Sequence, residues 1–412
     1  MTSSPNAVPE VTLEPQWYYS SCWAASLAMA AKVMAPDRKE LNQCYFIHKK
    51  QNEADKCGCL ERRFDPSAGA IVENNIYLTG NHDCGIYRHN TERAGSRETE
   101  KLAGEITGKT YCSARAIPLP LLQEKTDKRE PVIFYYLFAD LYNDRYGGKH
   151  ICLIHAIETL EQSHASPQFL IAIKDPWPTC WGTEYYMSYE SYKVQPYPVN
   201  ICLWDKAGPQ SSVEYSDTAC IQENKSGMYH TPEGAAGNIL ASLQYMLDNH
   251  KNTRFLEKIG LSAQSQENGK INLSGVFYEV NDVGSTIIRI NSNLNQISIR
   301  NLDNTRDFKK RIYFLVQDNE IKTSLIVCKS IKKNHYEGKW FLHTLENGER
   351  YRKVIQKLSE TDPAGTNDLA LFRITGRKNG EVLLKYQGDA VAAGHKKDQV
   401  DYRIVSRIRF DD

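Results

Sequence analysis

The sequence lacks an apolar run long enough to cross a membrane, a strong charge imbalance and a leader-like segment. A membrane-spanning helix needs about 20 consecutive apolar residues, and no stretch of the 412 residues approaches that length. Residues 1–12 contain neither a basic segment nor an apolar run, so no secretory signal is expected. A net charge of +1 favours neither nucleic acid nor a membrane surface as a partner. We therefore expect a cytoplasmic location, with export or delivery as an effector left open.

Cysteine is plentiful but unevenly distributed, which suggests two parts. The chain has eleven cysteines, and all but Cys328 precede residue 221. Residues 206–237 are rich in Gly, Pro, Ser and Asp, a composition typical of a linker or long loop. A chain of 412 residues has the length of two domains. We expect domains at residues 1–205 and 238–412, joined by this linker and separable from each other.

The cysteines do not follow a recognisable metal-binding pattern. An odd number of cysteines without a secretory signal favours reduced thiols. One group could be read as a zinc cluster, but Cys-x-Cys with irregular partners is not the spacing of a zinc finger. This group comprises Cys44, Cys57, Cys59, Cys84, His82 and His89. We expect no metal and no cofactor, and interpret the region as a cysteine-rich loop.

One cysteine stands where a reactive thiolate is favoured. Cys22 precedes an apolar run over residues 24–34, which predicts a buried helix with Ser20 or Ser21 as its N-cap. At a helix N-terminus, aligned peptide dipoles and unpaired N–H groups favour the thiolate, and the thiolate is the nucleophilic form. The alternative is a buried structural cysteine, which is the commoner fate of this residue type.

A cysteine nucleophile needs an imidazole base and a third group that orients the imidazole. His150 follows a Gly-Gly turn and begins an apolar strand, and residues 171–175 form a second strand that ends at Asp175. His155 lies five residues after His150 on the same strand, so the two histidines face opposite sides and only one can face Cys22. We expect His150 to be the base and His155 to be a core residue. The alternative for Asp175 is that it only begins a turn with Pro176.

The oxyanion of a tetrahedral intermediate needs hydrogen-bond donors near the nucleophile. The side-chain amide of Gln16, six residues before Cys22, and the backbone N–H of Cys22 could supply them.

In these positions the chain resembles the papain-like cysteine peptidases, and more closely the bacterial branch that includes bacteriocin-processing and type-III-effector peptidases. The resemblance covers about residues 10–205 and keeps the chain order Gln, Cys, His, Asp. Two positions depart from the family: residues 19–21 read Tyr-Ser-Ser where members often have Cys-Gly-Ser, and Ala156 replaces a usual Gly. The similar stretches are Gln16, Cys22-Trp23-Ala24, His150 with Ala156, Asp175 with Trp177, and Asn42-Gln43-Cys44 with Cys57-Gly58-Cys59.

The resemblance implies an α+β, papain-like N-terminal domain, in which the helix carrying Cys22 packs on a bent antiparallel sheet carrying His150 and Asp175. It implies an oxyanion hole that includes Gln16, and a shielding role for Trp177 over the bond between His150 and Asp175. The implied activity is cysteine-type endopeptidase hydrolysis of a protein or peptide by a Cys-His-Asp triad. Two alternatives stay open: acyl transfer, deamidation or deubiquitinase-like hydrolysis on the same triad, and a non-catalytic module that binds a partner.

The C-terminal half predicts a second α+β domain with a mostly antiparallel sheet. Apolar residues repeat at helical spacing over residues 239–247, and residues 349–358 predict another helix. Asn379-Gly380 is a hairpin signal between two predicted strands. Strands are expected at residues 276–280, 286–290, 297–300, 311–316, 324–328, 340–345, 369–374, 382–386 and 402–410. We recognise no catalytic constellation here and expect this half to recognise a substrate or a regulatory or target protein.

Overall fold

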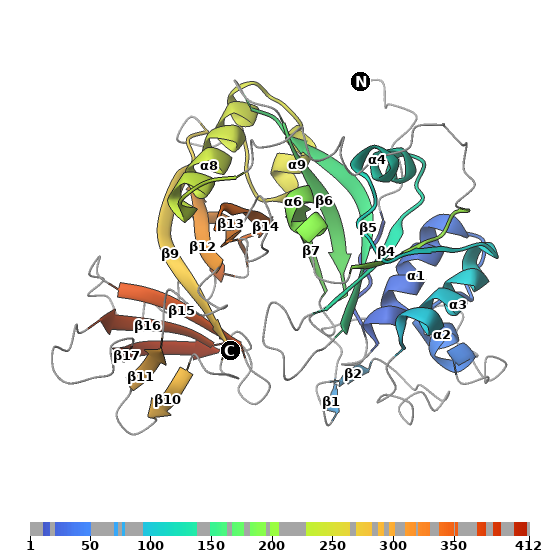
Figure 1. The fold of residues 1–412 in the computed structure, drawn as a ribbon, viewed down its shortest axis with the longest axis horizontal. Coiled ribbons are helices and arrows are strands. Elements are labelled where there is room, and N and C mark those ends of the chain that lie inside the picture. Colours follow the sequence, from blue (N-terminus) through green and yellow to red (C-terminus); the bar gives the residue numbers. More distant parts are fainter. Residues whose placement is uncertain are drawn as a thin grey trace.

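The computed structural model has an α+β architecture dominated by one large sheet (Figure 1). This is the fold class expected from the sequence. Helices cover the sheet on both faces in the N-terminal half, and one long helix packs on it in the C-terminal half. The structure describes residues 11–16, 21–50, 70–72, 76–78, 94–137, 149–162, 167–176, 182–194, 198–205, 228–263, 269–281, 287–291, 296–300, 310–318, 320–329, 338–349, 351–352, 369–375, 382–388 and 399–409.

In the described ranges, fifteen strands form the large sheet in the order β10-β11-β17-β16-β15-β9-β12-β13-β14-β7-β6-β5-β4-β8-β3. Every neighbouring pair is antiparallel except β9 and β15, which run parallel. Strands β1 (Ala70–Val72) and β2 (Ile76–Leu78) form a separate hairpin. The N-terminal strands are β3 (Tyr111–Ser113), β4 (Val132–Leu137), β5 (Lys149–Leu160), β6 (Gln168–Asp175), β7 (Thr183–Ser188) and β8 (Val199–Cys202).

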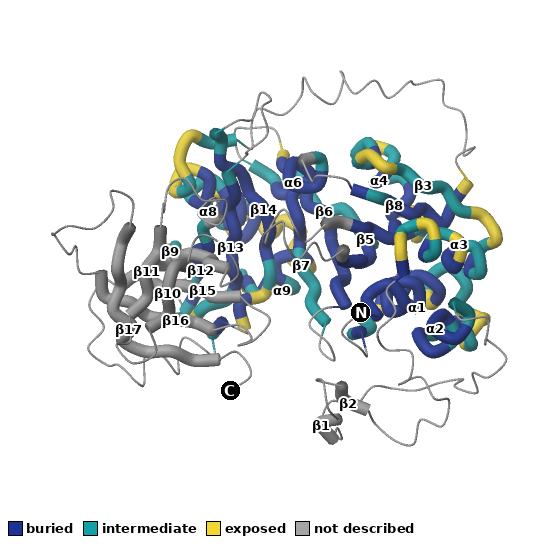
Figure 2. The backbone as a smooth tube through the Cα atoms, turned by 60° about the horizontal axis from the view of Figure 1, so that its bottom comes forward, coloured by how far each residue is buried: buried dark blue, intermediate teal, exposed yellow. Residues whose placement is uncertain are grey.

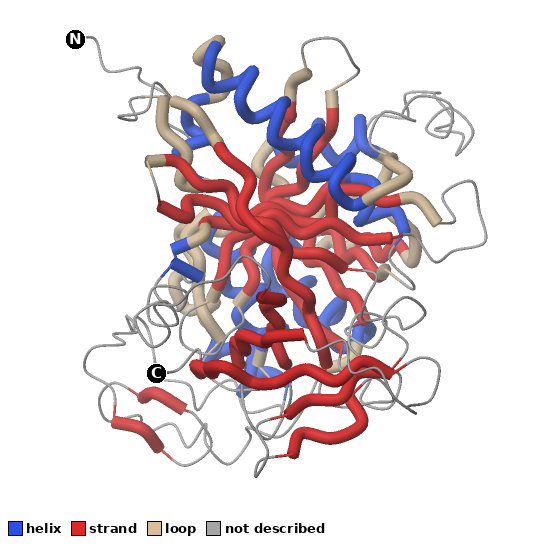
Figure 3. Tube along the Cα trace, turned by 90° about the vertical axis from the view of Figure 1, so that its left-hand side faces the viewer, coloured by secondary structure: helices blue, strands red, loops and turns tan. Residues whose placement is uncertain are grey.

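The strands of the C-terminal half follow the sequence expectation closely, because each is a short β-branched or aromatic run bounded by polar residues. Adjacent strands of this sheet are strongly rotated relative to one another, so the sheet is twisted (Figure 3). They are β9 (Asn272–Asn281), β10 (Ile287–Asn291), β11 (Gln296–Arg300), β12 (Lys310–Gln317), β13 (Glu320–Lys329), β14 (Trp340–Asn347), β15 (Leu369–Thr375), β16 (Val382–Gly388) and β17 (Gln399–Arg409). The expected Asn379-Gly380 turn lies outside the described residues, but the strands that flank it pair antiparallel.

The helices divide between the two halves. The N-terminal half has α1 (Cys22–Met34), α2 (Gln43–Lys50), α3 (Ser96–Thr107), α4 (Leu119–Asp127) and α6 (Tyr189–Val194). The C-terminal half has α8 (Pro232–Asp248) and α9 (Thr253–Lys258), and α9 was not anticipated. Of the helix expected over residues 349–358, positions 349, 351 and 352 are helical and the rest lies outside the described residues. No described helix combines the length and apolarity needed to cross a bilayer.

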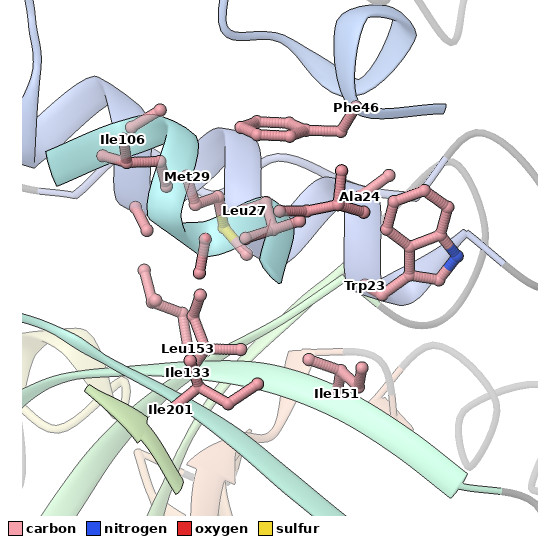
Figure 4. Packing of buried hydrophobic residues seen from close by; sticks show 14 of the residues in the cluster. Trp23, Ala24, Leu27, Met29, Phe46, Ile106, Ile133, Ile151, Leu153 and Ile201 are labelled. Atoms are coloured by element: carbon pink, nitrogen blue, oxygen red, sulfur yellow. The ribbon is translucent and has the colours of Figure 1, made fainter. Parts of the chain in front are cut away.

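Helix α1 lies where the sequence predicts a helix, and it is buried along most of its length (Figure 2). Its alanines let it lie close to its neighbours, while Leu27 and Met29 fill the space above the sheet (Figure 4). Ile151 and Leu153 of β5 belong to the same apolar cluster. The Ser26 hydroxyl also donates a hydrogen bond to the Ile151 carbonyl at 3.1 Å. Each large apolar side chain buried here contributes about 1.5–3 kcal/mol, so α1 is firmly held on the strand that carries His150.

The two halves share one sheet and one core, so the prediction that they are separable needs the truncation experiment described in the Discussion. Strand β14 pairs with β7, with Leu345 opposite Tyr186. The core cluster around α8 contains residues of both halves, including Leu170 of β6 and Leu325 of β13. Without the other half, β7 and β14 would each be an edge strand with unpaired backbone groups. Neither half therefore completes its hydrogen bonding alone.

The expected linker also ends earlier than predicted. Residues 206–227 lie outside the described residues, but Tyr229 forms a β-bridge with Trp340. Helix α8 begins at Pro232, because the Thr231 side chain caps it by accepting from Gly234 N–H and a proline is favoured in the first helical turn.

Candidate active site

Adjacent strands bring His150 and Asp175 together. In the β5–β6 ladder Leu153 lies opposite Lys174, so Cys152 and Asp175 are the next pair along. His150 lies two residues beyond Cys152 and therefore on the same face, diagonal to Asp175. Its Nε2 lies 2.5 Å from Asp175 Oδ1, and both residues are buried. Because the carboxylate accepts this hydrogen bond, Asp175 fixes the plane and the protonated nitrogen of the imidazole.

Cys22 is the first residue of α1. Its side chain is close enough to His150 to raise the pKa of that imidazole. Ser21 occupies the N-cap position, but its hydroxyl does not make the capping hydrogen bond that the sequence suggests. The order Cys22, His150, Asp175 is the arrangement that nucleophile, base and orienting group require.

The surroundings of His150 favour its charged form. Burial lowers the pKa of His150, whereas the charge and hydrogen bond of Asp175, followed by the hydrogen bond and charge of Cys22, raise it. The net result is a pKa raised from 6.5 to about 10. A raised pKa means that the imidazolium is kept at neutral pH and is lost only as the pH rises through about 10. An imidazolium beside a thiol stabilises the thiolate.

Gln16 is fully buried and is tied to the end of β6. Its backbone N–H donates to the Pro176 carbonyl at 3.0 Å, directly after Asp175. Gly182 permits this approach: its φ is +62°, and a Cβ there would lie 3.1 Å from both the Asp175 carbonyl and the Leu13 side chain. The segment that leads to Gln16 therefore lies against the strand that carries Asp175. Trp177, the expected shield, lies outside the described residues.

His155 faces a different polar group. Its Nε2 lies 3.5 Å from Glu184 Oε1, and Lys174 also pairs with Glu184. Burial lowers the pKa of His155. Burial would raise the pKa of Glu184, but the neighbouring His155 and Lys174 lower it to about 2. A register shift between Ile154 and Ala156 places a bulge at His155, which the simple alternation used on the sequence does not anticipate.

The structure adds no metal site to these groups. Among the residues that the structure describes, no three His, Cys, Asp or Glu side chains are placed to hold a metal ion. Cys44 is buried in the apolar cluster around α1, and the other five residues of the possible zinc cluster lie outside the described ranges. Four cysteines in the described ranges are free thiols: Cys22, Cys112, Cys152 and Cys202.

Comparison with known proteins gives a distant structural likeness. No family model matches the sequence, and no curated protein matches it. Among solved structures, the chain is similar to a Bacillus anthracis protein provisionally assigned as a C39-like peptidase. The match covers 47% of this chain and 94% of that chain, with 13% sequence identity and a TM-score of 0.27. A likeness this distant carries no argument about residues, so the roles below rest on the geometry of the site.

We expect Asp175→Asn to retain much of the activity that Asp175→Ala loses. An amide oxygen still accepts a hydrogen bond from His150 Nε2, and exchanging a charged acceptor for a neutral one costs about 1 kcal/mol, or roughly fivefold to tenfold in kcat/KM. Asp175→Ala removes the acceptor and is expected to cost about 10²-fold or more. Because the charge of Asp175 raises the pKa of His150, both variants should move the alkaline limb of the rate to lower pH.

The measurement is kcat/KM against pH for both variants on one peptide substrate. Near-wild-type values for Asn and Ala alike would remove Asp175 from the site and leave a pair of Cys22 and His150.

Proposed function

We propose that the chain is a cysteine peptidase that hydrolyses peptide bonds in a protein or peptide. The observation that carries the proposal is that Cys22, His150 and Asp175 are buried together: His150 Nε2 lies 2.5 Å from Asp175 Oδ1, and Cys22 is close enough to raise the pKa of His150. A structural core does not require a thiol at a helix terminus, an imidazole and a carboxylate to lie next to one another. Perturbed titratable groups in such a row are typical of a catalytic site.

In the proposed reaction, the Cys22 thiolate attacks the carbonyl carbon of the scissile bond, and a C–S bond forms as the carbonyl becomes an oxyanion. The Gln16 side-chain amide and the Cys22 N–H donate hydrogen bonds to that oxygen. His150 then gives its proton to the leaving amine, and the C–N bond breaks. A water molecule, deprotonated by His150, attacks the thioester, which releases the carboxylic acid and restores the thiolate with its imidazolium.

The same triad can pass the acyl group to an amine instead of water, and a competing-nucleophile experiment separates the two. The enzyme is incubated with a peptide library and a labelled primary amine, and the products are identified by mass spectrometry. New amino and carboxyl termini that are absent with Cys22→Ala support hydrolysis. Amine incorporation without chain cleavage would replace the peptidase proposal by acyl transfer.

We expect Cys22 to be the cysteine that alkylates fastest near neutral pH, because His150 holds a proton beside it and a thiolate is the reactive form. Cys328 is a matched control, since both residues are 8% exposed and differ in their neighbours rather than in their access to solvent. The measurement is labelling of the folded protein with iodoacetamide, followed by peptide mapping. Equal labelling rates for the two cysteines would show that Cys22 is not an activated nucleophile.

The proposal gives the C-terminal half the task of recognising the substrate or a regulatory or target protein. The support is the continuity of the sheet: β14 pairs with β7, and β7 is the neighbour of β6, the strand that carries Asp175. A ligand held by that half would therefore have a fixed place relative to the site. We propose no nucleic-acid or membrane partner and no cofactor.

A further inference from the structure

The short segment that ends at Gln16 is held from three directions. Its last residue, Gln16, donates its backbone N–H to Pro176 at the end of β6. Before it, Glu14 forms an ion pair with Lys32 of α1 at 2.6 Å. Between these two contacts, both Glu14 and Pro15 accept hydrogen bonds from one side chain of α2, that of Gln43.

Gln43 makes these contacts from a fully buried position at the start of α2. Its Nε2 lies 2.8 Å from Glu14 Oε1 and 2.9 Å from the Pro15 carbonyl oxygen. A primary amide nitrogen carries two hydrogens, so each acceptor receives its own donor. The Pro15 carbonyl belongs to the peptide bond that joins Pro15 to Gln16. The hydrogen bond from Gln43 therefore fixes the peptide unit directly before Gln16.

The packing of α2 does not explain why an amide is buried here. Cys44, Phe46 and Ile47 already anchor the helix in the apolar cluster around α1. A polar side chain buried at such a place costs free energy unless all its hydrogen bonds are made, and an apolar side chain would hold the helix as well. What an apolar side chain could not supply is a pair of donors that fixes residues 14 and 15.

We propose that Gln43 is a positioning residue that holds Gln16 in the geometry of the oxyanion hole. Gln43 does not touch the substrate; it acts through the backbone of Pro15 and the side chain of Glu14. The inference rests on the proposed function and deepens it. It predicts that loss of Gln43 weakens stabilisation of the oxyanion while leaving the thiolate at Cys22 unchanged, because the donors of Gln43 are directed at Glu14 and Pro15.

The test is Gln43→Leu, which keeps the approximate volume and removes both donors. We expect kcat to fall about tenfold or more while KM changes little, since a displaced oxyanion donor acts only in the transition state. The alkylation rate of Cys22 and its pH profile should match wild type. If Gln43 had only a structural role, its loss would lower the stability of the protein but would not lower kcat selectively while KM and the alkylation rate of Cys22 stay the same.

Two further variants keep the test readable. Gln43→Asn retains a buried amide but shortens the reach by one methylene, and it is read in the same way where Gln43→Leu does not fold. Asn42→Ala is the matched control, because Asn42 caps the same helix by accepting from Tyr45 N–H at 3.1 Å, a hydrogen bond local to the start of α2. Its loss should lower the melting temperature and leave kcat unchanged.

A double-mutant cycle with Gln16→Ala makes the route explicit. If Gln43 acts through Gln16, Gln43→Leu should lower kcat little further once the Gln16 amide is absent. Full kcat in both Gln43 variants of an active enzyme, or fully additive losses with Gln16→Ala, would overturn the inference. An inactive wild type with an unreactive Cys22 would instead overturn the proposed function, so the two failures are distinct.

Discussion

His150→Ala is expected to lower kcat/KM by about 10³-fold or more while the protein stays folded. The imidazole hydrogen-bonds to Asp175 and lies beside Cys22, so under the proposed mechanism its removal takes away the proton for the leaving amine and the charge that stabilises the thiolate. The fold should persist because α1 is held by apolar packing against β5. The measurement is kcat/KM on a peptide substrate, with circular dichroism to confirm the fold.

His155→Ala is the matched control on the same strand. His155 contacts Glu184 rather than the site, so its loss should lower stability by about 1–3 kcal/mol and spare the activity. A folded His150→Ala protein with full activity, together with an inactive His155→Ala protein, would reverse the assignment of the base.

A chain truncated after Asp205 is expected to lose cooperative folding. Truncation leaves β7 as an open edge and uncovers side chains that are at most 1% exposed in the whole protein, namely Leu160, Leu170, Ala172 and Tyr186. Loss of the packing around each large one costs about 2–5 kcal/mol, and the three together amount to about as much as the 5–15 kcal/mol that stabilises a typical domain. An open apolar edge strand also favours aggregation.

The measurement is thermal unfolding and size-exclusion chromatography of the truncated chain. The control is the full chain cut by a protease within residues 206–227, which should keep both fragments together and unfold in one transition. A truncated chain that is monomeric and melts at the temperature of the whole protein would contradict the shared core.

Local pattern was sufficient to predict the elements that carry the site. The apolar run after Cys22 predicted α1, and the runs around His150 and Asp175 predicted β5 and β6. His150 and Asp175 then meet because both sit at one end of adjacent antiparallel strands. These are short-range regularities, so spacing and residue type reveal them. The strands of the C-terminal half were predicted for the same reason.

Long-range pairing could not be predicted. Nothing in the residues of β7 and β14 specifies that they are partners, because many apolar strands fit one another equally well. The composition change near residue 221 suggested separable halves, whereas the shared core depends on which faces meet in three dimensions. The hydrogen bonds of Gln43 were equally hidden, since a glutamine at the start of a helix is usually exposed to solvent.

The pairing of β7 with β14 also sets an order in time. Ser188, at the end of β7, donates a hydrogen bond to the carbonyl of Leu342, which leaves the ribosome 154 residues later. At about 5–20 residues per second, the N-terminal strands wait roughly 8–30 s for the strand that completes their sheet. We expect the nascent chain to acquire proteolytic activity only after β14, which ends at Asn347, has been synthesised, so that the order of translation delays the action of the thiol until most of the chain has been made.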